Sequence, residues 1–121
     1  MVLAAVDDLL FSSKIRTTAK LAGVEIAFAR TPEAILAQAR ESKPALLIFD
    51  LNSAKTDPLA TIAAIKADPL LAAIRTIGFA SHVHTELIAA ARQAGADQVL
   101  PRSAFAGNLA DILRGAGATE P

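Results

Sequence analysis

The sequence predicts an open α/β domain in which a parallel β-sheet is covered by helices on both faces. Short, nearly continuous apolar runs alternate about five times with segments whose apolar residues recur three and four positions apart. Runs that are apolar throughout are typical of strands buried on both faces, as in parallel sheets. The chain has 121 residues, which is enough for one compact domain and too few for two.

The expected elements follow one another in a regular order. We expect strands at 2–6, 24–29, 45–49, 76–80 and 98–100. About five helices are expected between and after them, marked by these apolar stripes: Leu10, Phe11, Ile15 and Ala19; Ile35, Leu36 and Ala39; Leu59, Ile62 and Ile65; Leu87, Ile88 and Ala91; and Phe105, Leu109, Ile112 and Leu113. Each strand–helix–strand unit should form a right-handed crossover, which makes the strands parallel.

Local signals mark where several helices begin and end. Thr-Pro-Glu at 31–33 is typical of an N-cap followed by a first-turn proline and an acid, and Asp-Pro at 57–58 repeats the pattern. Gly23 and Gly95 each follow a helical stripe, at the position where a left-handed residue commonly ends a helix.

Composition argues against several classes of function. The 12 basic and 12 acidic residues cancel, which argues against nucleic acid or an anionic membrane as a partner. The lack of cysteine excludes disulfides, thiolate zinc sites and thiol nucleophiles, and it fits a cytoplasmic location. The first eight residues lack the basic leader of a signal peptide, and no apolar run approaches the roughly 20 residues of a membrane span. We expect residues 1–115 to form one domain and residues 116–121 to form a flexible tail.

Three acidic residues stand where strands are expected to end. Asp7 and Asp8 follow the first apolar run, and Asp50 follows the third. Ligands of open parallel sheets bind beyond the carboxyl ends of the strands, so these carboxylates should converge on one edge. Their mutual repulsion favours a hard divalent cation such as Mg²⁺, which would also hold a phosphoryl oxygen. Taken singly, Asp7 and Asp8 could instead be helix caps, a common role for acids after strands.

Several blocks of the sequence, in their order and spacing, resemble the receiver domains of two-component response regulators (the CheY-like family). Val-Asp-Asp at 6–8 is similar to the acidic pair after the first receiver strand, and Leu-Ile-Phe-Asp-Leu at 47–51 to the phosphoacceptor strand. The segments 65–69 and 74–77 resemble the stretch leading into the fourth strand. Ala-Arg-Gln-Ala-Gly-Ala-Asp at 91–97 resembles the turn before the fifth strand. The resemblance therefore spans nearly the whole chain.

This resemblance implies a fold and a site. The fold would be a flavodoxin-like doubly wound sheet of five parallel strands in the order 2-1-3-4-5, with helices on both faces. Asp50 would accept a phosphoryl group from a histidine kinase or phosphotransfer protein, as an aspartyl phosphate. Asp7, Asp8 and Asp50, with the backbone carbonyl of Asn52, would hold Mg²⁺.

The resemblance is incomplete at the residues that respond to the phosphoryl group. Receivers carry a Ser or Thr at the end of the fourth strand, where this chain has Ala80 followed by Ser81, a candidate substitute hydroxyl. Arg102 stands in place of the family lysine after the fifth strand; it keeps the charge but has a longer, planar head. The aliphatic Val99 lies near the family's aromatic switch position.

Two further groups of polar residues have a simpler interpretation. His82 and His84, with Glu86, could form a metal cluster. We interpret them as loop and helix-start residues beside the active edge, because alternate histidines before a helix have no fixed convergence. Ser-Ser-Lys at 12–14 is a weaker candidate for phosphate contact and more simply covers a first helix turn.

The function expected from these inferences is that of a stand-alone receiver in a phosphorelay. It would not be an enzyme, since no GxGxxG fingerprint and no nucleophile–base pair with a defensible spacing is present. With no output domain after it, the receiver would signal through a downstream protein partner. The alternative is a phosphorylation-independent pseudo-receiver that acts as a protein-interaction module, which the replacements at positions 80 and 102 favour.

The resemblance also implies a surface for partners. In receivers the fourth helix, fifth strand and fifth helix form the face that responds to phosphorylation. Here that face would include Leu87, Ala91, Val99, Phe105 and Leu109. Any exposed apolar members among them would favour a homodimer or a partner helix.

Overall fold

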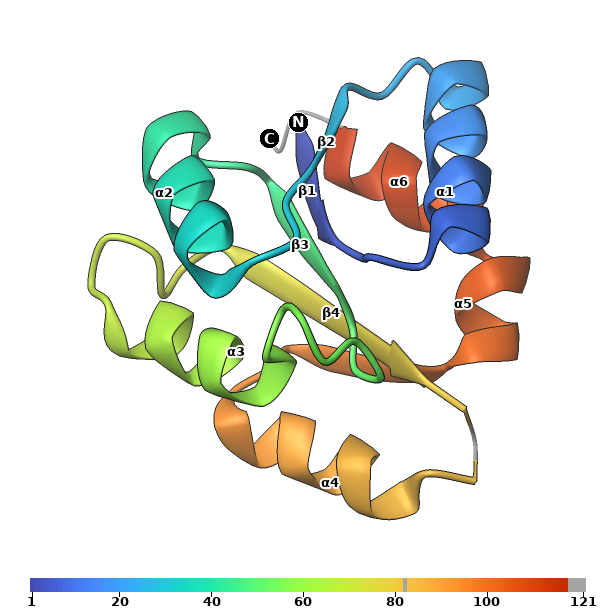
Figure 1. The fold of residues 1–121 in the computed structure, drawn as a ribbon. Coiled ribbons are helices and arrows are strands. Elements are labelled where there is room, and N and C mark those ends of the chain that lie inside the picture. Colours follow the sequence, from blue (N-terminus) through green and yellow to red (C-terminus); the bar gives the residue numbers. More distant parts are fainter. Residues whose placement is uncertain (82, 118–121) are drawn as a thin grey trace.

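The computed structural model describes residues 1–81 and 83–117. Its centre is a parallel sheet of five strands in the order β2-β1-β3-β4-β5, as predicted (Figure 1). The strands are β1 (Val2–Ala5), β2 (Ile26–Phe28), β3 (Leu46–Asp50), β4 (Arg75–Ala80) and β5 (Gln98–Pro101). This is the flavodoxin-like doubly wound arrangement, in which the strand order reverses between β1 and β3.

Helices cover both faces of the sheet. In the described residues they are α1 (Leu9–Ala22), α2 (Pro32–Ser42), α3 (Pro58–Ala67), α4 (Thr85–Ala94), α5 (Arg102–Gly107) and α6 (Leu109–Gly117). Figure 1 shows α1, α5 and α6 on one side of the sheet and α2, α3 and α4 on the other.

Each face of the sheet has its own hydrophobic core, because successive residues of a strand point to opposite sides. Leu3 of β1 packs in the core beneath α2–α4, which includes Ile62 of α3. Its neighbour Val2 packs in the core beneath α1, α5 and α6, together with Ile15 of α1 and Leu113 of α6. All residues of β1 and β3 are buried, which confirms the interpretation of their continuous apolar runs.

Three of the four predicted helix-end signals are confirmed. Thr31 caps α2 by accepting a hydrogen bond from the N–H of Ala34 at 3.1 Å. Gly23 and Gly95 end α1 and α4 with φ of 72° and 113°, in the left-handed region that glycine adopts without steric cost. The fourth is confirmed in part: α3 begins at Pro58 directly after Asp57, as predicted, but Asp57 has φ of 44° and its side chain makes no capping bond. A capping side chain requires an extended backbone at the N-cap, which Asp57 does not have.

The C-terminal region also differs from the prediction. The fifth apolar stripe forms two helices, α5 and α6, which are separated at Asn108. The Asn108 side chain donates to the carbonyl of Ala104 at 2.8 Å, and such bonds compete with helix continuation. α6 ends at Gly117, inside the expected tail at 116–121, and residues 118–121 lie outside the described residues.

The face expected to support a homodimer is mostly part of the core. Ala91, Val99, Phe105 and Leu109 are buried, and Leu87 is partly buried. They pack towards the sheet because their apolar periodicity is the one that fills the core. None of these five residues therefore contributes a fully exposed apolar surface, and the homodimer stays a prediction.

None of the helices in the described part of the chain combines the length and apolar character that crossing a membrane requires.

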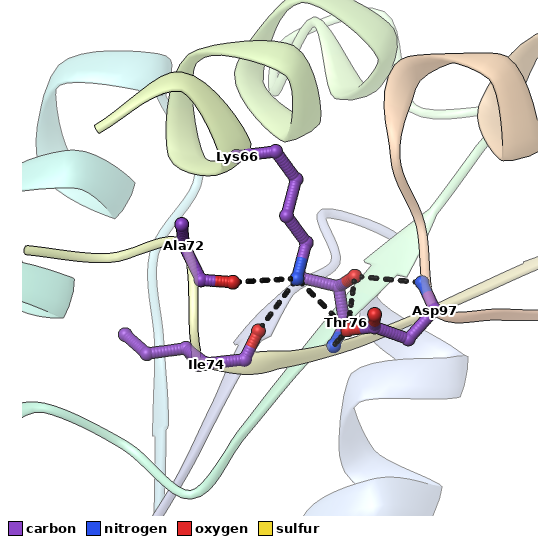
Figure 2. A network of polar contacts seen from close by, with 5 residues as sticks. All are labelled: Lys66, Ala72, Ile74, Thr76 and Asp97. Atoms are coloured by element: carbon purple, nitrogen blue, oxygen red, sulfur yellow. Dashed lines mark hydrogen bonds and ion pairs between the residues drawn. The ribbon is translucent and has the colours of Figure 1, made fainter. Parts of the chain in front are cut away.

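A polar network joins the amino ends of β4 and β5 to the end of α3 (Figure 2). The ammonium of Lys66 donates to the carbonyls of Ala72 and Ile74 at 3.1 and 2.9 Å. It also donates to Oδ2 of Asp97 at 2.8 Å. The same oxygen accepts from the backbone N–H and the hydroxyl of Thr76 at 2.8 and 3.2 Å, while the Asp97 N–H donates to that hydroxyl at 3.0 Å. The network holds three elements in register at the edge opposite Asp50.

Candidate functional site

The candidate site lies at the carboxyl edge of the sheet, where the strand order reverses. β1 and β3 are neighbours, and the chain leaves them towards opposite sides of the sheet. Crevices of this kind are where doubly wound sheets bind their ligands. The structure places Asp50 at the last position of β3, and Asp7 and Asp8 just after the end of β1. The predicted convergence of the three acids on one edge is therefore present in the fold.

Asp50 is the most enclosed acid of this edge. Only 3% of its surface is exposed, because it continues a strand that is buried along its whole length. Its Oδ1 accepts a hydrogen bond from the backbone N–H of Asn52 at 3.0 Å. Its main-chain carbonyl accepts from the N–H of Ser53 at 3.1 Å, which starts the tight turn after the strand. The turn thus holds the carboxylate in a fixed position at the end of β3.

Burial raises the pKa of Asp50 above its ordinary value. The N–H of Asn52 and the guanidinium of Arg102 lower it, while the negative charges of Asp7 and Asp8 raise it further. The net effect is a raised pKa, chiefly because burial removes water from the charged form of Asp50. An added cation beside Asp50 would favour its charged form.

The two acids after β1 differ in their surroundings. Asp7 is half-buried, and Asp8 is exposed. Asp8 is the N-cap of α1: its Oδ1 accepts from the N–H of Phe11 at 3.0 Å. The capping role that the sequence left open for Asp8 is therefore present, and it occupies one of the two carboxylate oxygens.

Arg102 supplies the positive charge of the site. It is the first residue of α5, directly after β5, and its Nη2 lies 3.6 Å from Oδ1 of Asp50. At this distance the contact is an ion pair and not a hydrogen bond. The guanidinium lies over two rings, 5.5 Å from the centre of Phe11 and 5.5 Å from that of Phe79. Phe105 extends this aromatic group, with its ring stacked on Phe79 at 4.5 Å.

This aromatic group was not predicted from the sequence. Its members come from α1, β4 and α5, and only the fold brings them together. The one available signal was that two of the five phenylalanines, Phe11 and Phe105, stand close to the acidic pair and to Arg102.

The last residue of β4 is Ala80, which has no hydroxyl. Ala80 is fully buried and lies opposite Pro101 of β5. Ser81 follows it, half-buried, and its carbonyl accepts from the N–H of His84 at 2.9 Å. Among the hydrogen bonds of the described residues, none joins the Ser81 hydroxyl to Asp50. The role of Ser81 as a substitute hydroxyl stays a prediction.

The loops after β3 and β4 meet at one side of the site. The Nδ2 of Asn52 lies 3.2 Å from Nδ1 of His84, and both residues line a groove of about 460 Å³ with Glu86 and Leu87. No pattern in the sequence predicted this contact, because its partners are 32 positions apart along the chain. His82, the other member of the histidine pair, lies outside the described residues.

The donor atoms at this edge fit a hard divalent cation by their chemistry. The carboxylates of Asp7, Asp8 and Asp50 and the carbonyl of Asn52 are oxygen donors, the type that Mg²⁺ and Mn²⁺ prefer. The buried negative charge of Asp50, with the charges of Asp7 and Asp8 acting on it, fits a cation as well. Within residues 1–81 and 83–117, however, no three His, Asp or Glu side chains are close enough together to enclose one. A cation would therefore have to draw these carboxylates inward.

Comparison with known proteins identifies the fold. No protein-family model matches the sequence, and no curated protein matches it. The chain is similar to a response regulator from Hahella chejuensis, with a TM-score of 0.81 and 18% identity, covering 93% of this chain and 90% of that one.

Two further solved structures are similar to this chain. The Mn²⁺-bound form of response regulator Rcp1 has a TM-score of 0.76 and 21% identity, over 99% of this chain and 97% of that one. The phosphorylated cyanobacterial phytochrome response regulator RcpA has a TM-score of 0.73 and 22% identity, over 99% and 96%. At such identities the likeness shows the fold alone: the chain has the fold of response-regulator receiver domains.

Proposed function

We propose that this chain is a receiver-like signalling domain of a two-component phosphorelay, in which Asp50 accepts a phosphoryl group. The observation that carries the proposal is a buried carboxylate at the reversal point of a receiver fold, with two more acids and one cation around it. The donor would be the phosphohistidine of a histidine kinase or phosphotransfer protein. This chain would act in the cytoplasm and would pass its signal to a downstream protein.

The contacts of Asp50 suggest which oxygen reacts. Its contacts with Asn52 and Arg102 both involve Oδ1, so we assign the attack on phosphorus to Oδ2. The new O–P bond replaces the N–P bond of the donor, and the imidazole leaves. No external substrate is turned over, which fits a signalling domain better than an enzyme.

The remaining residues would compensate the charge of the phosphoryl group. Arg102 is near enough to reach a phosphoryl oxygen, and its planar fork suits oxyanions. Asp7, Asp8 and Asp50, with the carbonyl of Asn52, would hold Mg²⁺, which supplies further charge compensation when bound. A divalent cation at this site is in keeping with the Mn²⁺-bound state of Rcp1.

A second candidate function is a phosphorylation-independent pseudo-receiver that works as a protein-interaction module. Three observations favour it. Asp50 already faces a cation in Arg102, and Asp8 already serves as a helix cap. In addition, the end of β4 carries Ala80 in place of a hydroxyl that could bind the phosphoryl group.

Treatment with Mg²⁺ and a small phosphodonor, followed by intact-mass measurement, tests the proposal. We expect the mass of one added phosphoryl group, which Asp50→Asn should prevent. Asp57→Asn is the matched control, because it removes an exposed acid from the same loop and should leave the modification unchanged. No added mass in the unaltered protein would favour the pseudo-receiver, whereas an added mass that persists in Asp50→Asn would mean that another residue accepts the phosphoryl group.

The altered switch residues lead to a further expectation. A hydrogen bond to a charged group contributes about 1.5–3 kcal/mol, which is comparable to a typical allosteric coupling energy. Ala80→Thr and Arg102→Lys should therefore enlarge the amide shift changes of α4 and α5 when beryllofluoride is added. Large shift changes in the unaltered protein would mean that Ser81 and Arg102 already couple the phosphoryl site to α4 and α5.

A further inference from the structure

Arg102 has an unusually well-defined place for a residue whose side chain is 37% exposed. Its guanidinium faces the carboxylate of Asp50 on one side and rests over the rings of Phe11 and Phe79 on the other. The ring of Phe79 is in turn fixed between Phe11, at 4.9 Å, and Phe105, at 4.5 Å. A flexible side chain therefore has a rigid aromatic support that keeps its charge beside the acid. We call this support, formed by Phe11, Phe79 and Phe105, the aromatic cradle.

The cradle is suited to an arginine in particular. A guanidinium is planar and weakly hydrated, so it can rest on an aromatic face while its N–H edge points at a carboxylate. An ammonium is compact and strongly hydrated, and would gain less from the same rings. The cradle therefore gives Arg102 a preferred position even though its contact with Asp50, at 3.6 Å, is looser than a hydrogen bond.

Arg102 and a divalent cation would use the same carboxylate. Oδ1 of Asp50 already accepts the N–H of Asn52 and faces Nη2 of Arg102. Two positive charges close to one carboxylate repel each other, so binding of one weakens binding of the other. The charges of Asp7 and Asp8 act on Asp50 from the end of β1, so the three acids and Arg102 share one electrostatic environment.

We propose that Arg102 is the resident cation of this site: held on the aromatic cradle, it competes with a divalent cation for Asp50 and sets the metal concentration at which the site loads. The inference rests on the proposed function insofar as it assigns metal binding to Asp50. On loading, the guanidinium has to leave Oδ1 of Asp50 and the position over Phe11 and Phe79 that holds it there.

The test is a Mg²⁺ titration of the full chain by NMR, without phosphodonor, following the amides of residues 7, 8, 50 and 52. Arg102→Gln should bind Mg²⁺ at least about tenfold more tightly than the unaltered protein, since a unit charge about 4 Å from a partly buried carboxylate acts strongly on it. Phe11→Leu keeps every charge and loosens the cradle, and it should tighten binding by about threefold. The Nε–Hε signal of Arg102 should shift during the titration of the unaltered protein.

Arg114→Gln is the matched control for net charge. Arg114 is an exposed arginine paired with Asp111 on α6, and its removal should leave the affinity for Mg²⁺ unchanged. An amide spectrum of each variant without metal checks that it folds, and Arg102→Lys, with an intermediate expected affinity, replaces any variant that does not.

Three outcomes would overturn the inference. Equal Mg²⁺ affinities in the unaltered and Arg102→Gln proteins would mean that no competition exists, although the metal site itself would stand. Tighter binding in Arg102→Gln with no change in Phe11→Leu would mean that charge alone acts and the cradle does not. No Mg²⁺ response in any variant would overturn the inference together with the metal part of the proposed function, whereas phosphoryl transfer to Asp50 is judged separately by mass.

Discussion

At the amino ends of β4 and β5, Asp97 accepts three hydrogen bonds at 2.8, 2.8 and 3.2 Å, although its side chain is 45% exposed. At the carboxyl end of β3, Asp50 is almost fully buried, and its ion pair with Arg102 is 3.6 Å long. Burial tends to raise the pKa of both acids. Lys66 and Thr76 more than offset this at Asp97, whose pKa is lowered, whereas the pKa of Asp50 stays raised.

The carboxyl edge collects other unfavourable features. The loop after Asp50 contains the buried hydroxyl of Ser53, which has no hydrogen-bond partner among the described residues. The same loop ends at Asp57, which has a left-handed backbone, but so does Lys43 before the amino end of β3, so this feature does not separate the two edges. Unsatisfied buried polar groups are uncommon in folded proteins. The hydrogen bonds of Asp97 therefore stabilise one edge, whereas the other keeps a buried carboxylate and a buried hydroxyl that a ligand or a modification could stabilise.

The largest effect that we expect concerns the amino edge of the sheet, where Lys66 binds Asp97. Lys66→Met should lower the free energy of unfolding by about 2–3 kcal/mol, because it removes charge-assisted hydrogen bonds to Asp97 and to two carbonyls. Urea denaturation followed by circular dichroism measures the change. Lys14→Met, which alters an exposed lysine of α1, should stay within about 0.5 kcal/mol. Similar losses in both variants would contradict the importance of the network.

A pair of glycine substitutions isolates the packing of Lys66. Alanine at Gly23 or Gly95 would adopt a left-handed backbone, at about 1–2 kcal/mol each. At Gly95 the new Cβ would also lie 2.7 Å from Cγ of Lys66, whereas at Gly23 it would meet nothing within 4 Å. Gly95→Ala should therefore cost about 1–2 kcal/mol more than Gly23→Ala. Equal costs would show that Lys66 can move away freely.

The smallest effect that we expect is a gain in the free energy of unfolding, and it concerns the carboxyl edge, where Asp50 lies. Asp50→Asn should raise the free energy of unfolding at neutral pH by about 1 kcal/mol, because it removes a buried charge that its surroundings do not compensate. Because the pKa of Asp50 is raised in the folded state, its negative charge lowers the free energy of unfolding fully above that folded pKa. Below the unfolded pKa of about 3.9 the carboxyl is protonated in both states, so its charge no longer affects stability. The gain should therefore be present at pH 7 and absent near pH 3.5 in urea titrations.

Asp97→Asn provides the contrast. The pKa of Asp97 is lowered in the folded state, so this acid stabilises the protein above its unfolded pKa and loses that contribution as the pH falls through the folded pKa. The substitution should therefore destabilise the protein at pH 7, where Asp50→Asn stabilises it. A shared sign for the two variants would remove the distinction between the two edges.

The amino-acid sequence by itself determined the α/β fold class, the position of Asp50 and most helix ends, while the strand order was implied by the resemblance to receiver domains. Buried strands, apolar helix stripes and C-terminal glycines depend on local backbone preferences and on which side of each element is apolar, and both are encoded along the chain. The position of Asp50 followed because the end of a buried parallel strand always lies at the ligand edge.

Only the tertiary structure decided how that edge is neutralised. The sequence contained Arg102 and Phe11 but could not bring them together, because 91 positions separate them and their contact depends on how α1 and α5 pack on the sheet. The same holds for Asn52 and His84, and for the burial of the face where a homodimer was expected. Side-chain contacts between distant elements depend on the relative placement of those elements, and local patterns along the chain do not specify it.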